Sequence, residues 1–320
     1  MSKFVLIVAL AVAIAGVSCD KGDREEETFA GIEAISFENY PKVDGSTSSS
    51  VLNMMVACRL LNLPHEWVEP GIVTEWTLHP KYSEIPGERW RFFEERVKTS
   101  QTHGAFVNLI DGNAELILTH RTISPDERAR ADSLGVALIE TPVAVDAFVF
   151  VVNKENSVRS LAVDQVRKIY AAGITRWSEV GGSDAAIKVF TRPRNSGSEE
   201  VLRELVMKDL EPAIFPESGI GGMSQVFGEV LGNRNAICYT FNNYKNLQAR
   251  VPDSEVPKIA INGVFPDEQT IKSGAYPFIS KVHVAIRSDL DRHSMAYKLY
   301  EWLQSAAAHS TIAACGFLPL

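Results

Sequence analysis

Residues 191–200, with the sequence TRPRNSGSEE, are the most informative part of this chain. A β-branched segment at 187–191 leads into this loop, and apolar residues at helical spacing follow it between 201 and 206. A strand, a polar loop and a helix start in this order can form an anion cradle, because the first amides of a helix have no internal partner and lie at the positive end of its dipole. The stretch therefore predicts an anion site in an α/β fold.

The side chains of this loop suit the same chemistry. Ser196 and Ser198 offer hydroxyl donors, Gly197 lets the backbone approach a ligand closely, and Arg192 or Arg194 can supply a forked cation. The alternative is that the loop is only a helix cap, because a glutamate follows Ser196 at the spacing of a capping box.

A second loop of the same kind occupies residues 43–50, VDGSTSSS, and runs into apolar residues at helical spacing at 51–61. One glycine followed by consecutive hydroxyl residues exceeds what a helix cap requires. A solvated serine-rich linker is the alternative, although linkers seldom run straight into an amphipathic helix. Two hydroxyl-rich helix starts far apart in the chain predict one site built from two lobes.

The first residues have the pattern of an export signal. Residues 1–18 carry one lysine and an apolar run at 4–17 that is shorter than the about 20 residues of a membrane span. Gly16-Val17-Ser18-Cys19 resembles a bacterial lipobox, which predicts that Cys19 is lipidated and becomes the mature N-terminus. A plain signal peptide cleaved elsewhere is the alternative. Residues 19–28 are charged and predict a tether.

Length and composition limit the possible functions. The chain of 320 residues is too long for one simple core and suits two lobes. Its net charge of −8 argues against a nucleic-acid partner but leaves a small anion possible. We expect Cys58, Cys238 and Cys315 to be buried free thiols, with one disulfide as the alternative. Cysteine and histidine spacings predict no metal site.

Strand and helix signals alternate along the chain, which predicts an α/β fold. The expected strands are 114–119, 144–152, 236–241, 258–262 and 282–286, and the expected helices are 89–97, 125–134, 162–171 and 295–307.

Several segments match, in order, the motifs of one known family. They are 44–47 (DGST), 146–154 (DAFVFVVNK), 169–177 (IYAAGITRW) with 180–182 (VGG), 195–198 (NSGS), 273–278 (SGAYPF) and 316–320 (GFLPL). Through these segments the chain resembles the phosphate-binding proteins of bacterial ABC-type phosphate transporters, which belong to the type II periplasmic-binding-protein superfamily. The resemblance covers nearly all of the chain after the signal.

The resemblance implies a two-lobed fold with a hinge between the lobes. We expect residues 1–18 as the signal peptide, 19–28 as the tether, 29–143 and 246–320 as lobe 1, and 144–245 as lobe 2. It further implies a monomer in the cell envelope, lipid-anchored on the periplasmic or surface face of a membrane, that captures inorganic phosphate or a related anion for an ABC transporter permease. No cofactor and no enzymatic activity are expected.

The candidate ligand contacts come from both loops and from two further segments. Thr102 stands in a segment that resembles a second ligand loop of the family. Arg121 follows an apolar strand, where it could clamp an oxyanion or instead pair with Glu115 or Asp126. The full candidate set is Ser46, Thr47, Ser48, Thr102, Arg121, Arg192, Asn195, Ser196, Gly197 and Ser198.

The chain also departs from the family pattern. Some members place acidic residues where this chain has Arg121 and Arg194, and such carboxylates accept the proton of a phosphate hydroxyl. Two arginines in their place imply a preference for a fully charged anion, or for a larger or organic phosphate. Glu199 adds a carboxylate beside the anion loop.

Two other function classes remain as hypotheses. The first is an anion sensor or surface scaffold that has the fold but no coupling to transport. The second is a serine hydrolase that uses one of the serine loops, although the chain lacks Ser-x-x-Lys in both loops and lacks Gly-x-Ser-x-Gly.

Overall fold

The computed structural model describes residues 31–69, 75–85, 87, 89–215 and 219–320. The expected signal peptide, Cys19 and the tether at 19–28 lie outside the described residues. Within the described part of the chain, no helix has the length and apolar character needed to cross a membrane.

The strands alternate with helices along most of the chain, as the sequence predicts. The strands are β1 (Val43–Gly45), β2 (His65–Val68), β3 (Thr77–Pro80), β4 (Leu116–Thr119), β5 (Leu138–Val152), β6 (Ser160–Leu161), β7 (Lys188–Val189), β8 (Ala236–Phe241), β9 (Ala260–Ile261), β10 (Ile279–Arg287) and β11 (Leu318–Pro319). The α-helices are α1 (Ser50–Leu60), α2 (Trp90–Arg96), α3 (Gln101–Ile110), α4 (Pro125–Ser133), α5 (Val163–Tyr170), α6 (Gly197–Val201), α7 (Gln225–Gly232), α8 (Glu268–Lys272), α9 (Met295–Leu303) and α10 (His309–Ala314). Short 3₁₀ turns are η1 (Thr47–Ser49), η2 (Tyr82–Glu84), η3 (Trp177–Val180) and η6 (Ala306–Ala308), and π turns are η4 (Leu202–Met207) and η5 (Tyr244–Ala249).

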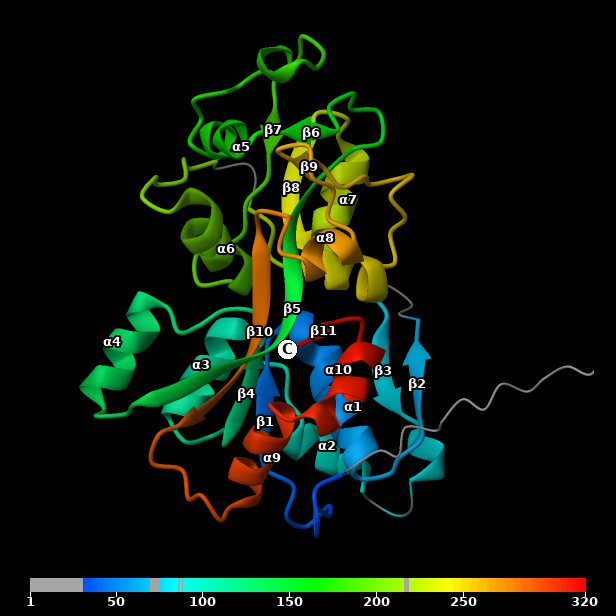
Figure 1. Ribbon diagram of the computed structural model, residues 1–320, viewed down its shortest axis with the longest axis vertical. Helices are drawn as coiled ribbons and strands as arrows, with labels where there is room; N and C mark the ends of the chain where they lie inside the picture. Colours follow the sequence, from blue (N-terminus) through cyan, green and yellow to red (C-terminus); the bar gives the residue numbers. More distant parts are fainter. Residues whose placement is uncertain (1–30, 70–74, 86, 88, 216–218) are drawn as a thin grey trace, which may run out of the picture.

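One mixed sheet runs through both halves of the molecule. Its strand order is β1-β4-β10-β5-β8-β7, and β11 pairs with β5. The long strands β5 and β10 are antiparallel neighbours and connect the lower part of Figure 1 with the upper part. They are the strands that connect the two lobes.

Each lobe has its own hydrophobic core. In the lower lobe, one cluster packs α1 and α9 against the sheet, and a second packs Phe106 and Leu109 of α3 against Ile117 and Ala285. The upper lobe has a cluster built on the buried half of β5, where residues 147–152 are fully inaccessible, together with α5, α7 and β8. The two-lobed α/β class predicted from the sequence is therefore confirmed.

The two hydrophobic cores indicate that the chain passes from lobe 2 back to lobe 1 at a later residue than the sequence predicts. Val256, Ile259 and Phe278 pack in the upper cluster, whereas Val282 and Val284 pack in the lower one. We therefore propose that the chain returns to lobe 1 within β10, rather than at residue 246. On the way out, β5 passes from the lower cluster at Ala144 to the upper cluster at Ala147, and we propose that the chain leaves lobe 1 there.

Most expected elements are present, with changed ends. β8 covers its expected residues, β5 and β10 are longer, and β9 is shorter. The expected loop around Thr102 is wrong, because Thr102 lies in the first turn of helix α3. Cys58, Cys238 and Cys315 are buried free thiols, as expected.

Candidate functional site

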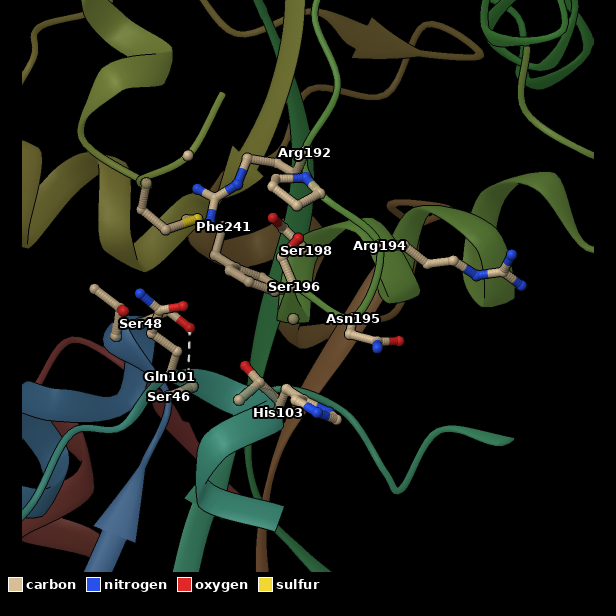
Figure 2. Close-up of a pocket in the computed structure, with 16 residues that line it drawn as sticks. Ser46, Ser48, Gln101, His103, Arg192, Arg194, Asn195, Ser196, Ser198 and Phe241 are labelled. Atoms are coloured by element: carbon tan, nitrogen blue, oxygen red, sulfur yellow. Dashed lines mark hydrogen bonds between the residues drawn. The ribbon is translucent and has the colours of Figure 1, made fainter. Parts of the chain in front are cut away.

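A cavity lies between the lobes where the two hydroxyl-rich loops face each other. Its volume is about 260 Å³, below the roughly 300–1,000 Å³ of pockets for drug-sized ligands. Figure 2 shows Ser46, Ser48 and His103 across from Arg192 and Ser198. The lining residues are Ser46, Thr47, Ser48, Gln101, Thr102, His103, Arg192, Pro193, Arg194, Asn195, Ser196, Gly197, Ser198, Gly221, Met223 and Phe241.

The first wall is the turn from β1 through η1 into α1. Gly45 is needed there, because a Cβ at this position would lie 2.8 Å from the carbonyl oxygen of Leu118 on β4. This close approach places Ser46 and Ser48 at the cavity. Both are buried, which a solvated serine linker would not be.

The second wall is the loop that leads from β7 into α6. Asn195 adopts the left-handed conformation with φ of 71°, which asparagine tolerates better than most residues. Ser196 is the N-cap of α6, and its Oγ accepts the Glu199 amide at 3.3 Å. The cap alternative is thus correct for Ser196, and it leaves Gly197 and Ser198 in the first turn beside the cavity.

Three buried polar atoms of this wall have no hydrogen-bond partner among the described residues. They are Arg192 Nε, Arg192 Nη1 and Ser198 Oγ. Burial lowers the pKa of Arg192, although a guanidinium remains charged near neutral pH. Buried donors need acceptors, so this wall suits a ligand with several acceptor oxygens.

A buried tyrosine holds the loop in place. The Arg192 amide donates to the Tyr239 hydroxyl at 2.8 Å, and that hydroxyl donates to Glu199 Oε2. Glu199 Oε1 accepts from Arg203 Nε at 3.2 Å. Burial raises the pKa of Glu199, and the bond from Tyr239 opposes the rise. The carboxylate expected beside the anion loop therefore faces the interior and does not line the cavity.

The lobes touch each other directly at this site. A Cβ added to Gly197 of α6 would lie 2.4 Å from Thr102 Oγ1 of α3. Asn195 Nδ2 donates across the lobes to Asp126 Oδ2 at 2.8 Å. Thr102 therefore lines the cavity, whereas the amide of Asn195 bonds to the other lobe.

Arg121 does not line the cavity, contrary to its expected place among the ligand contacts. Its Nη1 and Nη2 donate to Glu127 Oε2 and Oε1, each at 2.7 Å, and both side chains are buried. Glu127 also accepts from the Ser124 amide at 2.9 Å and bonds to His103 Nδ1 at 2.9 Å. The partner is neither Glu115 nor Asp126, the two named from the sequence. Arg121 thus completes a buried ion pair at the start of α4.

Arg194 borders the cavity, but it is exposed and its guanidinium points away from Arg192 and Ser198 (Figure 2). Arg121 and Arg194, the two arginines that depart from the family pattern, therefore do not direct their charge into the cavity. This arrangement removes the basis for expecting a preference for a fully charged anion. Among the described residues that line the cavity, none is acidic.

Sequence reasoning missed His120 and Asp146. His120 Nδ1 lies 2.9 Å from Ser48 Oγ, and its Nε2 lies 3.3 Å from Asp146 Oδ2. In the serine-hydrolase template the imidazole uses its nitrogens the other way round, with Nε2 at the serine. The only sequence signal for these residues was two polar side chains within apolar strand patterns.

The cavity can be compared with the full set of candidate residues. Of the ten, the structure brings nine together at the cavity and leaves out Arg121. Gln101, His103, Met223 and Phe241 line it as well and were not among the candidates.

Several known proteins with similar sequences are named phosphate-binding protein PstS. The phosphate-binding protein PstS of Bacillus subtilis is 25% identical over 186 residues, which cover 58% of this chain and 58% of that protein. The protein SphX of Synechococcus elongatus is 24% identical over 238 residues, which cover 70% and 68%. The chain thus spans less than two thirds of the length of the Bacillus relative.

Solved structures with a similar fold also carry names that refer to phosphate transport. An ABC-type phosphate transport receptor from Vibrio cholerae superposes with a TM-score of 0.58 at 23% identity, covering 86% of this chain and 98% of that one. A protein from Clostridium perfringens, solved with bound phosphate and assigned to a phosphate ABC transporter, gives 0.60 at 20% identity, covering 89% and 99%. At these identities the likeness shows the fold. A profile of the PBP superfamily domain matches residues 73–307, well over half of the sequence, and the chain therefore belongs to the PBP superfamily.

Proposed function

We propose that this chain is an extracytoplasmic substrate-binding protein that captures phosphate, or a closely related oxyanion, for an ABC transporter. One observation carries the proposal: Arg192 Nε, Arg192 Nη1 and Ser198 Oγ are buried donors at one cavity and have no partner among the described residues. A tetrahedral oxyanion between the lobes would accept from all three.

The small cavity and the surrounding charge support a small anion. Arg192 brings a buried guanidinium, and the first turn of α6 adds amides that have no intrahelical partner. Such local donors can hold an anion even though the whole chain is acidic, with a net charge of −8. The names of the relatives favour transport over a scaffold or a hydrolase.

The remaining parts of the proposal concern place and partners. We propose that Cys19 is lipidated, that the protein is held at the envelope membrane as a monomer, and that its closed form docks on a permease. The lipobox-like residues 16–19 support the anchor. The direct contact of Gly197 with Thr102 supports a closed form with its own surface.

Calorimetry of the purified protein tests the capture of phosphate. We expect binding by the wild type and a loss of at least about tenfold in Arg192→Ala, because a charge-assisted hydrogen bond contributes about 1.5–3 kcal/mol. Complementation of phosphate uptake in cells that lack the gene tests delivery. Absence of phosphate binding, or turnover of activated esters by the protein, would contradict the proposal.

A further inference from the structure

A second cavity lies where α6 and η4 of the upper lobe face β10 and the turn after β4 (Figure 1). Its volume is about 300 Å³, at the lower end of the roughly 300–1,000 Å³ of pockets for drug-sized ligands. Among the described residues, none lines both this cavity and the one that Arg192 borders. It is therefore a separate cavity between the lobes.

Three buried polar atoms of its lining residues lack a hydrogen-bond partner in the described part of the chain. They are Arg121 Nε, Ser280 Oγ and His283 Nδ1. Arg121 is 3% exposed and Ser280 is 5% exposed, so bulk water does not replace the missing partners. A buried polar atom without a partner destabilises a fold. Three such atoms at one cavity indicate that a ligand completes their hydrogen bonds.

The Arg121 guanidinium brings a donor to this cavity but little free charge. Its Nη1 and Nη2 already donate to Glu127, each at 2.7 Å. The Nε–H remains, and it can only donate. Sheet pairing brings this residue near β10, because His283 lies opposite Thr119, two residues before Arg121.

His283 adds an uncharged partner. Burial, with smaller effects of His120 and Lys281, lowers the pKa of His283 to about 4. The ring is therefore neutral near neutral pH. A neutral imidazole has one nitrogen that donates and one that accepts, so Nδ1 can serve a ligand atom of either kind.

Two exposed side chains give this cavity opposite charges. Lys281 comes from β10 and Glu204 from η4. The cavity that Arg192 borders has no acidic residue among its described lining residues, whereas here the two charges offset each other. A simple oxyanion therefore gains little at this second cavity, and a zwitterion suits both charges.

Part of the wall is apolar. Val201, Leu205 and Ile279 line the cavity. An apolar group that leaves water for this part of the wall is stabilised in proportion to the area it buries. The ligand that these walls suit has a carboxylate, an ammonium and an apolar side chain.

We propose that this cavity is a second ligand site, for a free α-amino acid with a branched apolar side chain. Its carboxylate accepts from Arg121 Nε and Ser280 Oγ, its ammonium pairs with Glu204, and its side chain packs on Leu205 and Ile279. The inference goes beyond the proposed function, since it requires neither phosphate nor a transporter. Both cavities can be filled at once, because they share no described lining residue.

Calorimetry of the purified protein with L-leucine tests the site, with and without saturating phosphate. We expect leucine to bind, with a Kd that phosphate leaves unchanged or lowers. Analogues of leucine test the recognition of each group. Isocaproate lacks the ammonium, isoamylamine lacks the carboxylate and glycine lacks the side chain, so each should bind at least about fivefold more weakly than leucine.

Two variants and a matched control locate leucine in this cavity. Ser280→Ala removes a donor to the carboxylate and should weaken leucine binding about tenfold or more. Glu204→Lys puts a like charge beside the ammonium and should weaken leucine binding at least about fivefold, but not the binding of isocaproate, which has no ammonium. Glu229→Lys reverses an exposed charge on α7 of the same lobe and should leave the leucine Kd as in the wild type.

All three variants should still bind phosphate, and thermal unfolding shows whether each is folded. Glu204 is exposed, so Glu204→Lys tests the site even if Ser280→Ala does not fold. The inference is overturned if leucine does not bind, if phosphate competes with leucine, or if Glu204→Lys leaves the leucine Kd unchanged. A wild type that binds leucine but not phosphate would contradict the proposed function and support this inference.

Discussion

At the scale of single residues, the serines of the 191–200 loop differ in their surroundings. Ser196 Oγ caps α6 by accepting the Glu199 amide, whereas Ser198 Oγ is buried and has no partner among the described residues. The two hydroxyls therefore have different roles, although the sequence pattern presents them as equivalent donors.

Paired alanine variants separate these roles. Ser198→Ala should weaken phosphate binding about 10–100-fold, because one hydrogen bond to a charged group contributes about 1.5–3 kcal/mol. Ser196→Ala should mainly lower the free energy of unfolding, by about 1 kcal/mol for a lost cap. Calorimetry and urea unfolding measure the two effects. Equal losses of affinity in both variants would contradict the assignment.

His283 gives a pH dependence of stability. Burial lowers its pKa to about 4, and His120 and Lys281 add to the effect. The unfolded chain takes up this proton near pH ~6.5. The free energy of unfolding should therefore fall as the pH drops from about 6.5 to about 4, by at most about 3 kcal/mol, with no further loss from this group below that window.

His283→Gln should flatten the stability curve in that pH window. The exposed His293 is the matched control, because His293→Gln should leave the curve as in the wild type. Urea unfolding at a series of pH values measures both. A wild-type stability that is flat between pH 6.5 and 4 would show that His283 is not held neutral.

At the scale of elements, α3 and α6 meet at a glycine. A methyl group at Gly197 would lie 2.4 Å from Thr102 Oγ1 but 3.3 Å from Thr102 Cβ. An alanine at position 197 therefore fits only if the Thr102 side chain moves or is shortened. This meeting point joins the two lobes beside the cavity.

Gly197→Ala should hinder closure and weaken phosphate binding by about tenfold or more, with little loss of stability, since each lobe keeps its core. In the Thr102→Ala background the same substitution should cost much less, because the closest atom is gone. Calorimetry of the four proteins measures this coupling. Additive losses would show that closure does not depend on this contact.

The elements also show what the sequence could predict. Strong local patterns gave β8 at its observed residues and the helix start after Ser124, where serine and proline stand in sequence. Helix α3 was missed because it begins with Gln101 at a φ of 63° and carries Gly104 in its first turns. The short hairpin of β2 and β3 has no clear alternation and was missed as well.

At the site, the local sequence pattern identified both loops, but it did not identify the hydrogen-bond and ion-pair partners of their neighbouring side chains. The sequence offered Glu115 or Asp126 as partners of Arg121, whereas the turn into α4 places Glu127 opposite it. His120 directly follows β4 and Asp146 lies in β5, and only the folded sheet brings His120 to both Ser48 and Asp146. Such contacts depend on tertiary geometry that local patterns do not encode.

At the scale of the whole molecule, the anchor is the part that the fold does not explain. Because Cys19 follows small residues and an apolar run, Cys19→Ala should release soluble protein or leave an uncleaved precursor. Membrane fractionation and the mass of the mature protein measure this. A variant that fractionates and weighs as the wild type would exclude lipidation at this cysteine.

The proposed function requires one oxyanion held between the two lobes, with Arg192 and Ser198 as donors. A crystal structure of the protein with phosphate tests it most directly. We expect the phosphate oxygens within about 3 Å of Arg192 Nε, Arg192 Nη1 and Ser198 Oγ, with one further oxygen facing Ser46 or Ser48. Phosphate bound elsewhere, or bound while these three donors remain without an acceptor, would contradict it.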